Sequence, residues 1–467
     1  MKVFLNVQNK NIILFILLIL FGSLTFIYEH NSIVVSLMIV LLCVSLWVFG
    51  LVPAYVTSLV LFCLVFYFKP DLFSKTLSGF SSSGFWLAFS GIVWGKAINQ
   101  TGLSTKISSV VTLVFSRRYS SVIIGSILLG AALAFIMPSA MGRVMLLVPI
   151  LTGIATHLGF AKSNRGYYGI VLAGVFATYL LGFTILPSNL SNMVLSSLSS
   201  HFYHLDLNYA QYILVHFPVL GGLKLLLLFV LTMFMFHQPI PNVTRDDIYN
   251  GNEKLGQPTN RHFTAKEIKL SLYLLVALLL WCTDSYHHIP ASFVGMTISV
   301  ICLLPVIGVI DSNQFIKEVN VAPLFYIAGI VGLGIFVNDS GLGQFIAHSL
   351  IDFLRSQYQP GIHGFLVLNS LFAAIGLITT VPGIPALVSP SLGLVSPIVN
   401  ESTAHLIMMQ PISFSTLILP YQAPPVVVAM QLSGLKLGKV TKYCLLMAAM
   451  TCVILYPIDY YWLQYVL

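Results

Sequence analysis

The chain has 467 residues, of which 57% are hydrophobic and only 8% are charged, whereas a soluble globular protein carries roughly 25% charged residues. Apolar stretches of about 20 residues, long enough to cross a bilayer as helices, recur along the whole sequence and exclude a separate soluble domain. The net charge of +8 lies in short loops between these stretches, so it reflects membrane orientation and excludes a basic nucleic-acid-binding face.

The sequence predicts an all-α, polytopic membrane protein with about eleven transmembrane helices and two re-entrant hairpins. The spanning stretches cover residues 11–28, 32–49, 52–68, 79–101, 167–198, 212–236, 268–283, 292–310, 321–337, 405–432 and 440–462. The hairpins cover residues 121–157, which bend at Pro138, and residues 365–399. We expect the first hairpin to consist of two half-length helices that enter and leave the membrane on one side. Amphipathic segments over residues 106–118 and 342–355 precede the hairpins.

One long hydrophilic loop, residues 237–266, divides the chain. It ends in Thr264-Ala-Lys-Glu267, a capping box that predicts the start of the next helix. With the N-terminus in the cytoplasm, most of the 22 Lys and Arg residues lie on the inner side, as the positive-inside rule requires. We therefore expect a multi-pass protein of the cell (inner) membrane with a cytoplasmic N-terminus and an external C-terminus.

Two sequence patterns occur twice. The first pattern is Gly91-Ile-Val-Trp followed by Asn99-Gln-Thr-Gly-Leu103, and its second copy is Gly329-Ile-Val-Gly followed by Asn338-Asp-Ser-Gly-Leu342. The second pattern is Ile185-Leu-Pro-Ser-Asn189, and its second copy is Ile418-Leu-Pro-Tyr-Gln422. An odd number of crossings separates the copies, which predicts inverted repeats over residues 79–236 and 319–467, with scaffold helices within residues 1–78 and 267–318. Broken segments in corresponding positions of inverted halves point to the binding site of a secondary transporter.

Four broken segments should meet near the membrane midplane: hairpin tips around Ser139 and Thr380, and unwound stretches around Asn189 and Gln422. Proline removes a backbone donor, and the carbonyl groups that it frees are tolerated at this depth only where protein or a cavity satisfies them. Free carbonyls suit a cation such as sodium, whereas helix N-termini and hydroxyl groups suit an anion.

Arg143 is a cation inside an apolar stretch. All 14 acidic residues fall in loops or near the ends of predicted spans, so we expect no carboxylate at its depth. A guanidinium binds carboxylate or sulfate oxygens in a bidentate fork, so the substrate itself is one candidate counter-charge. The alternative is that Arg143 satisfies hairpin carbonyls or extends to the inner face.

Two lysines, Lys96 and Lys224, also fall in apolar stretches, and we expect them to extend to the membrane surface or to form interhelical contacts. The absence of a predicted intramembrane acid argues against an Asp or Glu proton relay. Histidines near the span ends, His157, His216 and His405, leave a weaker route for protons.

The sequence Gly84-Phe-Trp-Leu-Ala-Phe-Ser-Gly-Ile-Val-Trp94, followed by Thr101-Gly-Leu, resembles the fourth helix of the divalent anion/sodium symporter (DASS) family of the ion-transporter superfamily. Members of that family carry dicarboxylates, citrate or sulfate, and each inverted half has a Ser-Asn-Thr hairpin tip and a broken helix with a Gly-Thr-Pro-Pro-Asn-like turn. Ser139 keeps the family's spacing to Pro149, but Ala140 and Met141 replace the Asn and Thr. Residues 380–382 and the turns around Asn189 and Gln422 match the family pattern only in part.

The resemblance implies a secondary active transporter of a small anion, a di- or tricarboxylate or sulfate, that works by an elevator mechanism as a homodimer in the lipid bilayer, with sodium as the coupling ion and no other cofactor. The substrate-binding residues that we expect are Ser139, Arg143, Ser188, Asn189, Thr380 and Gln422; Arg143 is included for its charge, because the family pattern gives it no role. The implied cation-binding residues are Ser139, Ala140, Pro187, Asn192, Thr380, Val381 and Ala423.

Two alternatives remain open. An anion exchanger or a proton-coupled permease of the same superfamily would lack sodium coupling. A membrane-embedded enzyme would need a nucleophile, base or metal cluster at membrane depth, and no such set is evident in the sequence, so no catalytic or metal-binding residue is predicted. Partners other than the anion, the bilayer and a second copy are not expected, and nucleic acid is excluded.

Overall fold

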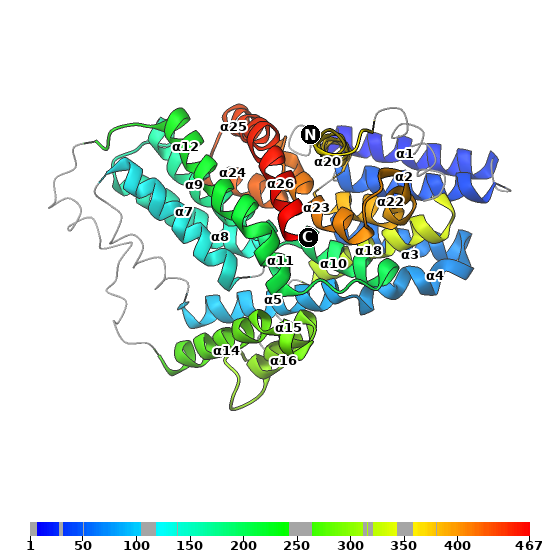
Figure 1. Cartoon of the computed structure of the whole chain (residues 1–467), viewed down its shortest axis with the longest axis horizontal. Coiled ribbons are helices and arrows are strands. Elements are labelled where there is room, and N and C mark those ends of the chain that lie inside the picture. The colour runs from blue at the N-terminus through cyan, green and yellow to red at the C-terminus, as the bar shows by residue number, and fades with distance from the viewer. Residues whose placement is uncertain are drawn as a thin grey trace.

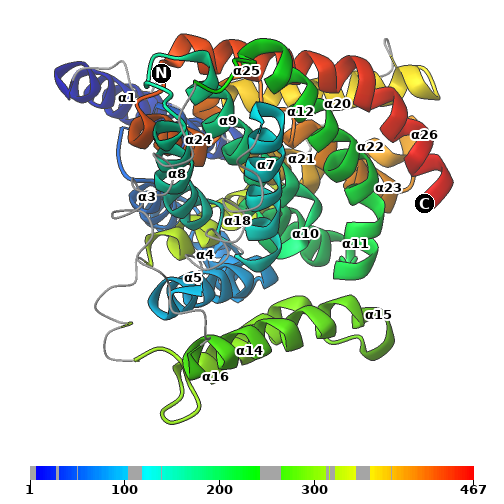
Figure 2. The ribbon, with the colours of Figure 1, turned by 90° about the vertical axis from the view of Figure 1, so that its left-hand side faces the viewer.

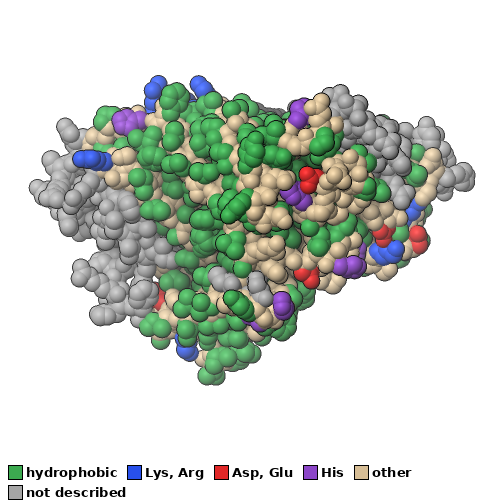
Figure 3. Space-filling model, viewed as in Figure 1, with side chains coloured by type: hydrophobic (Ala, Val, Ile, Leu, Met, Phe, Trp, Pro, Cys, Tyr) green, Lys and Arg blue, Asp and Glu red, His purple; other side chains and the backbone are tan. Residues whose placement is uncertain are grey.

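The computed structural model of the chain describes residues 7–27, 31–49, 51–103, 118–137, 139–241, 264–311, 315, 321–342, 358–379 and 381–467. Every regular element within these ranges is a helix, which confirms the all-α fold (Figure 1). Hydrophobic side chains dominate the face in Figure 3, and the Lys and Arg residues visible there lie near its margins, as expected of a protein surrounded by lipid.

Five helical segments of the described residues are long and apolar enough to cross a membrane. They are Tyr119–Ile136, Arg165–Thr184, Tyr209–Phe236, Ala322–Asp339 and Leu437–Val466. The pair Gly383–Val399 and Thr403–Phe414, bent by 117°, raises the number to six if it counts as one span. Shorter apolar helices of 10–17 residues fill several other predicted spans, so the full number of eleven spans stays a prediction.

The N-terminal helices form a layer beside the second repeat. They are α1 (Val7–Ile27), α2 (Ser32–Phe49), α3 (Ala54–Phe68), α4 (Pro70–Thr76) and the 3-10 helix η1 (Leu77–Ser81). Helix α3 packs against α18 (Ala322–Asp339). A Cβ at Gly329 of α18 would lie 2.2 Å from Ser58 Oγ, so the missing side chain permits this close approach.

A second group of helices lies along α5 (Ser83–Thr101), as Figures 1 and 2 show. It consists of α14 (Ala265–Cys282), α15 (Asp284–His287) and α16 (Ala291–Leu303). Trp94 of α5 stacks on Trp281 of α14 with 5.2 Å between the ring centroids. The predicted capping box begins α14, because Thr264 N donates to Glu267 Oε2 at 2.6 Å and Glu267 N donates to Thr264 Oγ1 at 3.3 Å.

The two repeats contain the same series of elements. After α5, the first has α7 (Tyr119–Ile136), α8 (Ala140–His157), α9 (Arg165–Leu181), η2 (Gly182–Thr184), η3 (Leu186–Ser188), α10 (Leu190–Tyr203), α11 (Tyr209–His216), η4 (Phe217–Leu223) and α12 (Lys224–Phe236). After α18, the second has α20 (Ile362–Ile378), α21 (Gly383–Val388), η6 (Ser389–Ser391), α22 (Leu392–Val399), α23 (Thr403–Phe414), η7 (Pro420–Gln422), α24 (Pro424–Ser433), α25 (Leu437–Met450), η8 (Thr451–Leu455) and α26 (Tyr456–Val466). Each series is a helix, a hairpin, a broken helix and a last long helix.

In the first hairpin, α7 ends at Ile136 and α8 begins at Ala140, on either side of the predicted bend. Helices α7 and α8 both pack along α9 and contact each other. Each has 18 residues, which corresponds to about 27 Å at 1.5 Å per residue, so the expectation of half-length arms is wrong. Pro138 lies outside the described residues, as do nearly all residues of the two predicted amphipathic segments.

The last helix of each repeat contains a π-helical stretch that the sequence analysis did not predict. These stretches are η4, between α11 and α12, and η8, between α25 and α26. Pro218 lies within η4, and Pro457 is the second residue after η8. Proline leaves the carbonyl four residues earlier without its helical donor, and a widened turn is one way for a helix to accommodate this.

Candidate functional site

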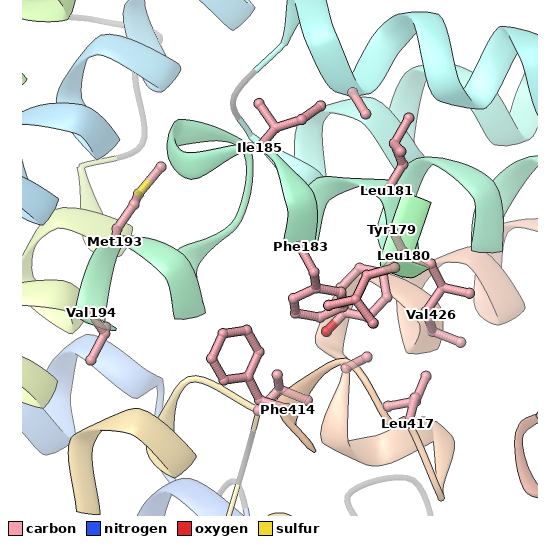
Figure 4. Packing of buried hydrophobic residues seen from close by; sticks show 14 of the residues in the cluster. Tyr179, Leu180, Leu181, Phe183, Ile185, Met193, Val194, Phe414, Leu417 and Val426 are labelled. Atoms are coloured by element: carbon pink, nitrogen blue, oxygen red, sulfur yellow. The ribbon is translucent and has the colours of Figure 1, made fainter. Parts of the chain in front are cut away.

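The four broken segments are joined by direct contacts. Arg143, from the first hairpin, donates to Ser188 of the first break. Val381 N, at the second hairpin tip, donates to the carbonyl of Gln422 in the second break at 3.2 Å. Phe183 and Phe414, which flank the two breaks, lie with ring centroids 5.6 Å apart. Figure 4 shows their side chains and those of neighbouring apolar residues gathered between the two breaks.

The first tip is organised by Ser139, which is the N-cap of α8. Its Oγ accepts a hydrogen bond from Gly142 N at 3.2 Å, and Ala140 is the first residue of the helix. A hydroxyl at this position satisfies one of the free N–H groups that begin every helix. In this conformation the hydroxyl of Ser139 therefore serves the helix start.

Arg143 is fully buried and makes its contacts with the protein's own oxygens. Nη1 donates to the carbonyl of Met137, to Ser188 O at 3.1 Å and to Ser188 Oγ at 2.8 Å. Nη2 donates to Thr178 O and Ser188 O, both at 3.1 Å. This geometry matches the alternative in which Arg143 satisfies hairpin carbonyls, and no acidic residue in the described ranges forms an ion pair with it.

Gly182 provides the space that the guanidinium occupies. A Cβ at this position would lie 2.8 Å from Arg143 Nη2 and 3.4 Å from Ser188 O. Ser188 in turn donates its hydroxyl to Ala134 O at 2.7 Å. The arginine thus joins both arms of the first hairpin to the end of α9 and to the break that follows it.

The first break contains polar atoms that lack partners. Asn189, the N-cap of α10, accepts a hydrogen bond from Ser191 N at 3.0 Å. Asn192 donates to Gly182 O at 2.9 Å and to Ile185 O at 3.0 Å. Four buried atoms here have no hydrogen-bond partner among the described residues: Asn189 Nδ2, Ser191 Oγ, Asn192 Oδ1 and Thr178 Oγ1. The sequence analysis missed Ser191 and Thr178, although Ser191 lies between two residues that it selected.

The second break is held by Gln422. Its Oε1 accepts from Ile418 N at 2.9 Å and from Leu419 N at 2.7 Å, and its Nε2 donates to Gly376 O at 2.6 Å. Ala423, the N-cap of α24, is fully buried, and its N–H donates to Pro420 O at 3.1 Å. Thr380, predicted for both substrate and cation, lies outside the described residues.

The predicted site is closed in this conformation. Ser188 and Gln422 are 1% exposed, Asn189 is 4% exposed, and Pro187 and Asn192 are also buried. A cavity of about 180 Å³ lies elsewhere, between η1, the start of α5, the end of α10 and α18, and is lined mainly by serines and His201. None of the predicted site residues lines this cavity.

Two ionisable residues that were not predicted for the site are also buried. Lys224 is fully buried and donates to Ser415 O and Ser415 Oγ, both at 2.9 Å, which confirms an interhelical contact. Asp459, at 1% exposure, is buried as well. Asp459 lies near the end of the last predicted span, as expected, but its side chain packs inward, which the sequence analysis did not predict. Within the described ranges, no group of three or more His, Cys, Asp or Glu could hold a metal ion.

The sequence profile of the family described as "Sodium:sulfate symporter transmembrane region" matches residues 7–467. The chain belongs to this family. Membership confirms the resemblance to divalent anion/sodium symporters and places the chain among membrane transport proteins, not enzymes. The all-α, multi-pass architecture agrees with that assignment.

Two further comparisons support the fold. A protein described as "Membrane protein" from Cupriavidus necator is 23% identical over 304 residues, which cover 64% of this chain and 57% of that relative. The chain thus matches less than two thirds of that relative's length. The crystal structure of the Alcanivorax borkumensis YdaH transporter, described as having an unusual topology, aligns with a TM-score of 0.53 at 13% identity over 85% of this chain and 88% of that chain. At this identity the likeness shows the fold alone.

Proposed function

We propose that this protein is a secondary active transporter that carries a small anion, a di- or tricarboxylate or sulfate, through an elevator-type movement coupled to sodium. It would work as a homodimer in the inner membrane with a cytoplasmic N-terminus. The observation that carries the proposal is the set of unpartnered polar atoms at the first of two contacting helix breaks.

The start of α10 has the chemistry of an anion site. A helix N-terminus carries a partial positive charge and free N–H groups. Asn189 Nδ2 and the Ser191 hydroxyl add two donors there that have no partner within the described structure. A buried polar group without a partner costs about 1–3 kcal/mol, so an anion that accepts from both would remove that cost.

Asn192 offers the complementary chemistry for a cation. Its Nδ2 is fixed by the carbonyls of Gly182 and Ile185, and its Oδ1 is a buried acceptor with no donor among the residues described. A sodium ion binds oxygen atoms of this kind, and the carbonyls of an unwound stretch supply further ones. The cation role of Ser139, Ala140, Pro187, Val381 and Ala423 belongs to the same proposal, as does that of Thr380.

The hydrogen bonds between hairpins and breaks support an elevator movement. Arg143 joins the first hairpin to the first break, and the Val381–Gln422 bond joins the second hairpin to the second break. Each hairpin would therefore move with its own break as one body. The N-terminal helices and the α14–α16 group would form the scaffold.

An exchanger or a proton-coupled permease is the second candidate. It is favoured by Ala140 and Met141, which stand where the resembled family has Asn and Thr and so lack two groups that support sodium. Arg143 as a direct substrate ligand also stays a prediction, since its terminal nitrogens bind carbonyls in this conformation while its buried Nε has no partner in the described chain.

Binding and uptake measurements test the proposal. We expect one carboxylate or oxyanion of a panel to raise the melting temperature of the purified protein, and proteoliposomes to accumulate that anion when sodium, but not choline, is outside. Accumulation in choline that requires an internal anion or a pH gradient would support the second candidate. No thermal shift and no uptake for any anion would refute both.

Two variants locate the site. Ser191→Ala and Asn189→Ala should each weaken anion binding about tenfold, which corresponds to 1.4 kcal/mol. Ser196→Ala, on the same helix, is the matched control and should bind as the wild type does. Equal affinity in all four proteins would remove the start of α10 as the anion site.

A further inference from the structure

Lys224 and Asp459 occupy related positions in the two repeats. Lys224 is the first residue of α12, directly after the π-helical η4, and Asp459 lies in the first turn of α26, shortly after the π-helical η8. The stretches η4 and η8 contact each other, and α26 contacts η4. Both residues lie inside segments long enough to span the membrane, Tyr209–Phe236 and Leu437–Val466. Ionisable groups buried at such depth mark functional sites more often than structural ones.

Lys224 acts on the second break. Its two hydrogen bonds go to the carbonyl and the hydroxyl of Ser415. Ser415 is the C-cap of α23, so it is the residue at which the helix stops and the unwound stretch begins. A change in the charge of Lys224 would therefore reach the broken segment through a direct contact.

Asp459 is a buried acid with an unused oxygen. It is 1% exposed, and its Oδ1 has no hydrogen-bond partner in the part of the chain that is described. The helix that carries it, α26, contacts η4, which ends directly before Lys224, although no ion pair joins these two described side chains. A buried carboxylate that lacks hydrogen bonds costs several kcal/mol when ionised, and protonation removes that cost.

Other titratable groups near this pair come from each neighbouring element. Cys452 lies in η8, and Tyr456 is the first residue of α26. The hydroxyl of Tyr456 lies 3.2 Å from Thr416 Oγ1. Of the remaining packed elements, α20 contributes one ionisable side chain, His363, in its first turn, and α23 contributes His405, which pairs with Glu401 at 3.9 Å.

His216 is a buried histidine that lies near the first break. His216 ends α11 and packs on Tyr212, with ring centroids 4.4 Å apart. Tyr212 donates to Phe183 O at 3.2 Å, beside the first break. Among the described residues, Asp459 is thus the buried acid on the elements that pack beside Lys224.

We propose that Asp459 and Lys224 form a proton-binding centre that couples proton movement to anion transport. The Asp459 carboxylate binds one proton from water on one side of the membrane and releases it on the other. No other bond forms or breaks. When Asp459 is protonated, its negative charge no longer acts on Lys224 across the contact between α26 and η4, so the Lys224–Ser415 contact holds the second break differently in the two protonation states. This inference rests on the proposed anion transport and assigns a proton as an ion that moves with it.

Infrared difference spectra test the proton site without transport. Between acidic and alkaline pH, the purified protein should show a C=O stretching band of a buried carboxylic acid. The band should vanish in Asp459→Asn, shift in Asp459→Glu and persist in Asp206→Asn, a matched control at an exposed acid. A spectrum that is the same in Asp459→Asn and in the wild type would overturn the assignment. If Asp459→Asn fails to fold, an unshifted band in Asp459→Glu would also overturn the assignment.

Proteoliposomes containing a pH-sensitive dye test the coupling. Anion uptake by the wild type should change the internal pH. Asp459→Asn, which mimics the protonated acid, should exchange anion for anion but lose at least ten-fold in anion-driven proton movement, whereas Asp206→Asn and Lys442→Met should behave as the wild type. Anion transport without proton movement would refute the inference and leave the proposed function standing. If the protein carries no anion at all, both the proposed anion transport and its coupling to proton movement are refuted. The infrared band then decides whether Asp459 binds a proton.

Discussion

The two helix breaks have the same place in the fold but are held by different cations. At the first break, Arg143 donates to the carbonyls of Met137, Thr178 and Ser188. At the second, Lys224 donates to Ser415. Arginine presents a planar fork of donors, whereas the lysine ammonium is a compact point charge on a flexible stem. The first break is therefore joined to several carbonyls at once and the second to a single residue.

The two breaks also differ in their buried polar atoms that lack hydrogen-bond partners. The first break retains Asn189 Nδ2, Ser191 Oγ and Asn192 Oδ1 without partners in the described structure. At the second, the Gln422 amide is fully engaged with Ile418, Leu419 and Gly376. The two repeats thus share an order of elements but differ in their unpartnered atoms: in our proposals, the first break offers groups to a ligand and the second is tied to the proton-binding centre.

The largest expected effect is that of Arg143→Ala. It leaves the carbonyls of Met137, Thr178 and Ser188 buried without their donor, and each such group costs about 1–3 kcal/mol. We expect a loss of more than about 3 kcal/mol in stability, seen as a much lower melting temperature in detergent. Arg143→Lys should recover only part of this loss, because an ammonium cannot reproduce the planar fork.

Gly182→Ala provides a second view of the same contact. The added Cβ would meet Arg143 Nη2 at 2.8 Å, so the guanidinium must shift. Gly95→Ala is the matched control, because its Cβ would find only Met137 Cε, at 3.8 Å. If Arg143→Ala melts like the wild type but loses anion binding, the arginine serves the substrate and the contrast between the two breaks disappears.

Gln422→Leu should have an intermediate effect. It leaves the N–H groups of Ile418 and Leu419 and the carbonyl of Gly376 without partners, but these groups lie at a break that Lys224 still holds. We expect a destabilisation of about 1–3 kcal/mol, measured by thermal unfolding. Gln431→Leu, at an exposed position of α24, is the control. A larger loss for Gln422→Leu than for Arg143→Ala would show that the second break is the more firmly held.

The sequence predicted the parts of this arrangement that proline and local spacing determine. The breaks around Asn189 and Gln422 and the capping box at Thr264 all carry local signals. The repeated patterns around Gly91 and Gly329 predicted two halves, and the helix, hairpin and broken helix follow one another in the same order after each pattern. Local rules suffice there because each feature depends on a few adjacent residues.

Contacts between segments that are distant in the chain could not be predicted from such local signals. Arg143 and Ser188 are 45 residues apart, and Lys224 and Ser415 are 191 residues apart. Asp459 looked like a span-end acid, since nothing in the sequence says which way a residue near a terminus faces. The two π-helical stretches also went unnoticed, because a proline in an apolar helix predicts a kink as readily as a widened turn.

The smallest effect, and the one that joins the two breaks, is expected at the Phe183–Phe414 contact. The rings lie 5.6 Å apart, and such pairs contribute about 0.5–1.5 kcal/mol beyond burial. A double-mutant cycle with Phe183→Leu and Phe414→Leu should give an interaction energy in that range from melting data. The matched cycle at Phe66 and Phe73, whose rings lie 5.0 Å apart in the scaffold, should leave transport unchanged. If the first cycle gives no interaction energy, this contact does not couple the two breaks. Proton binding near the second break could then not change ligand binding at the first break through this contact.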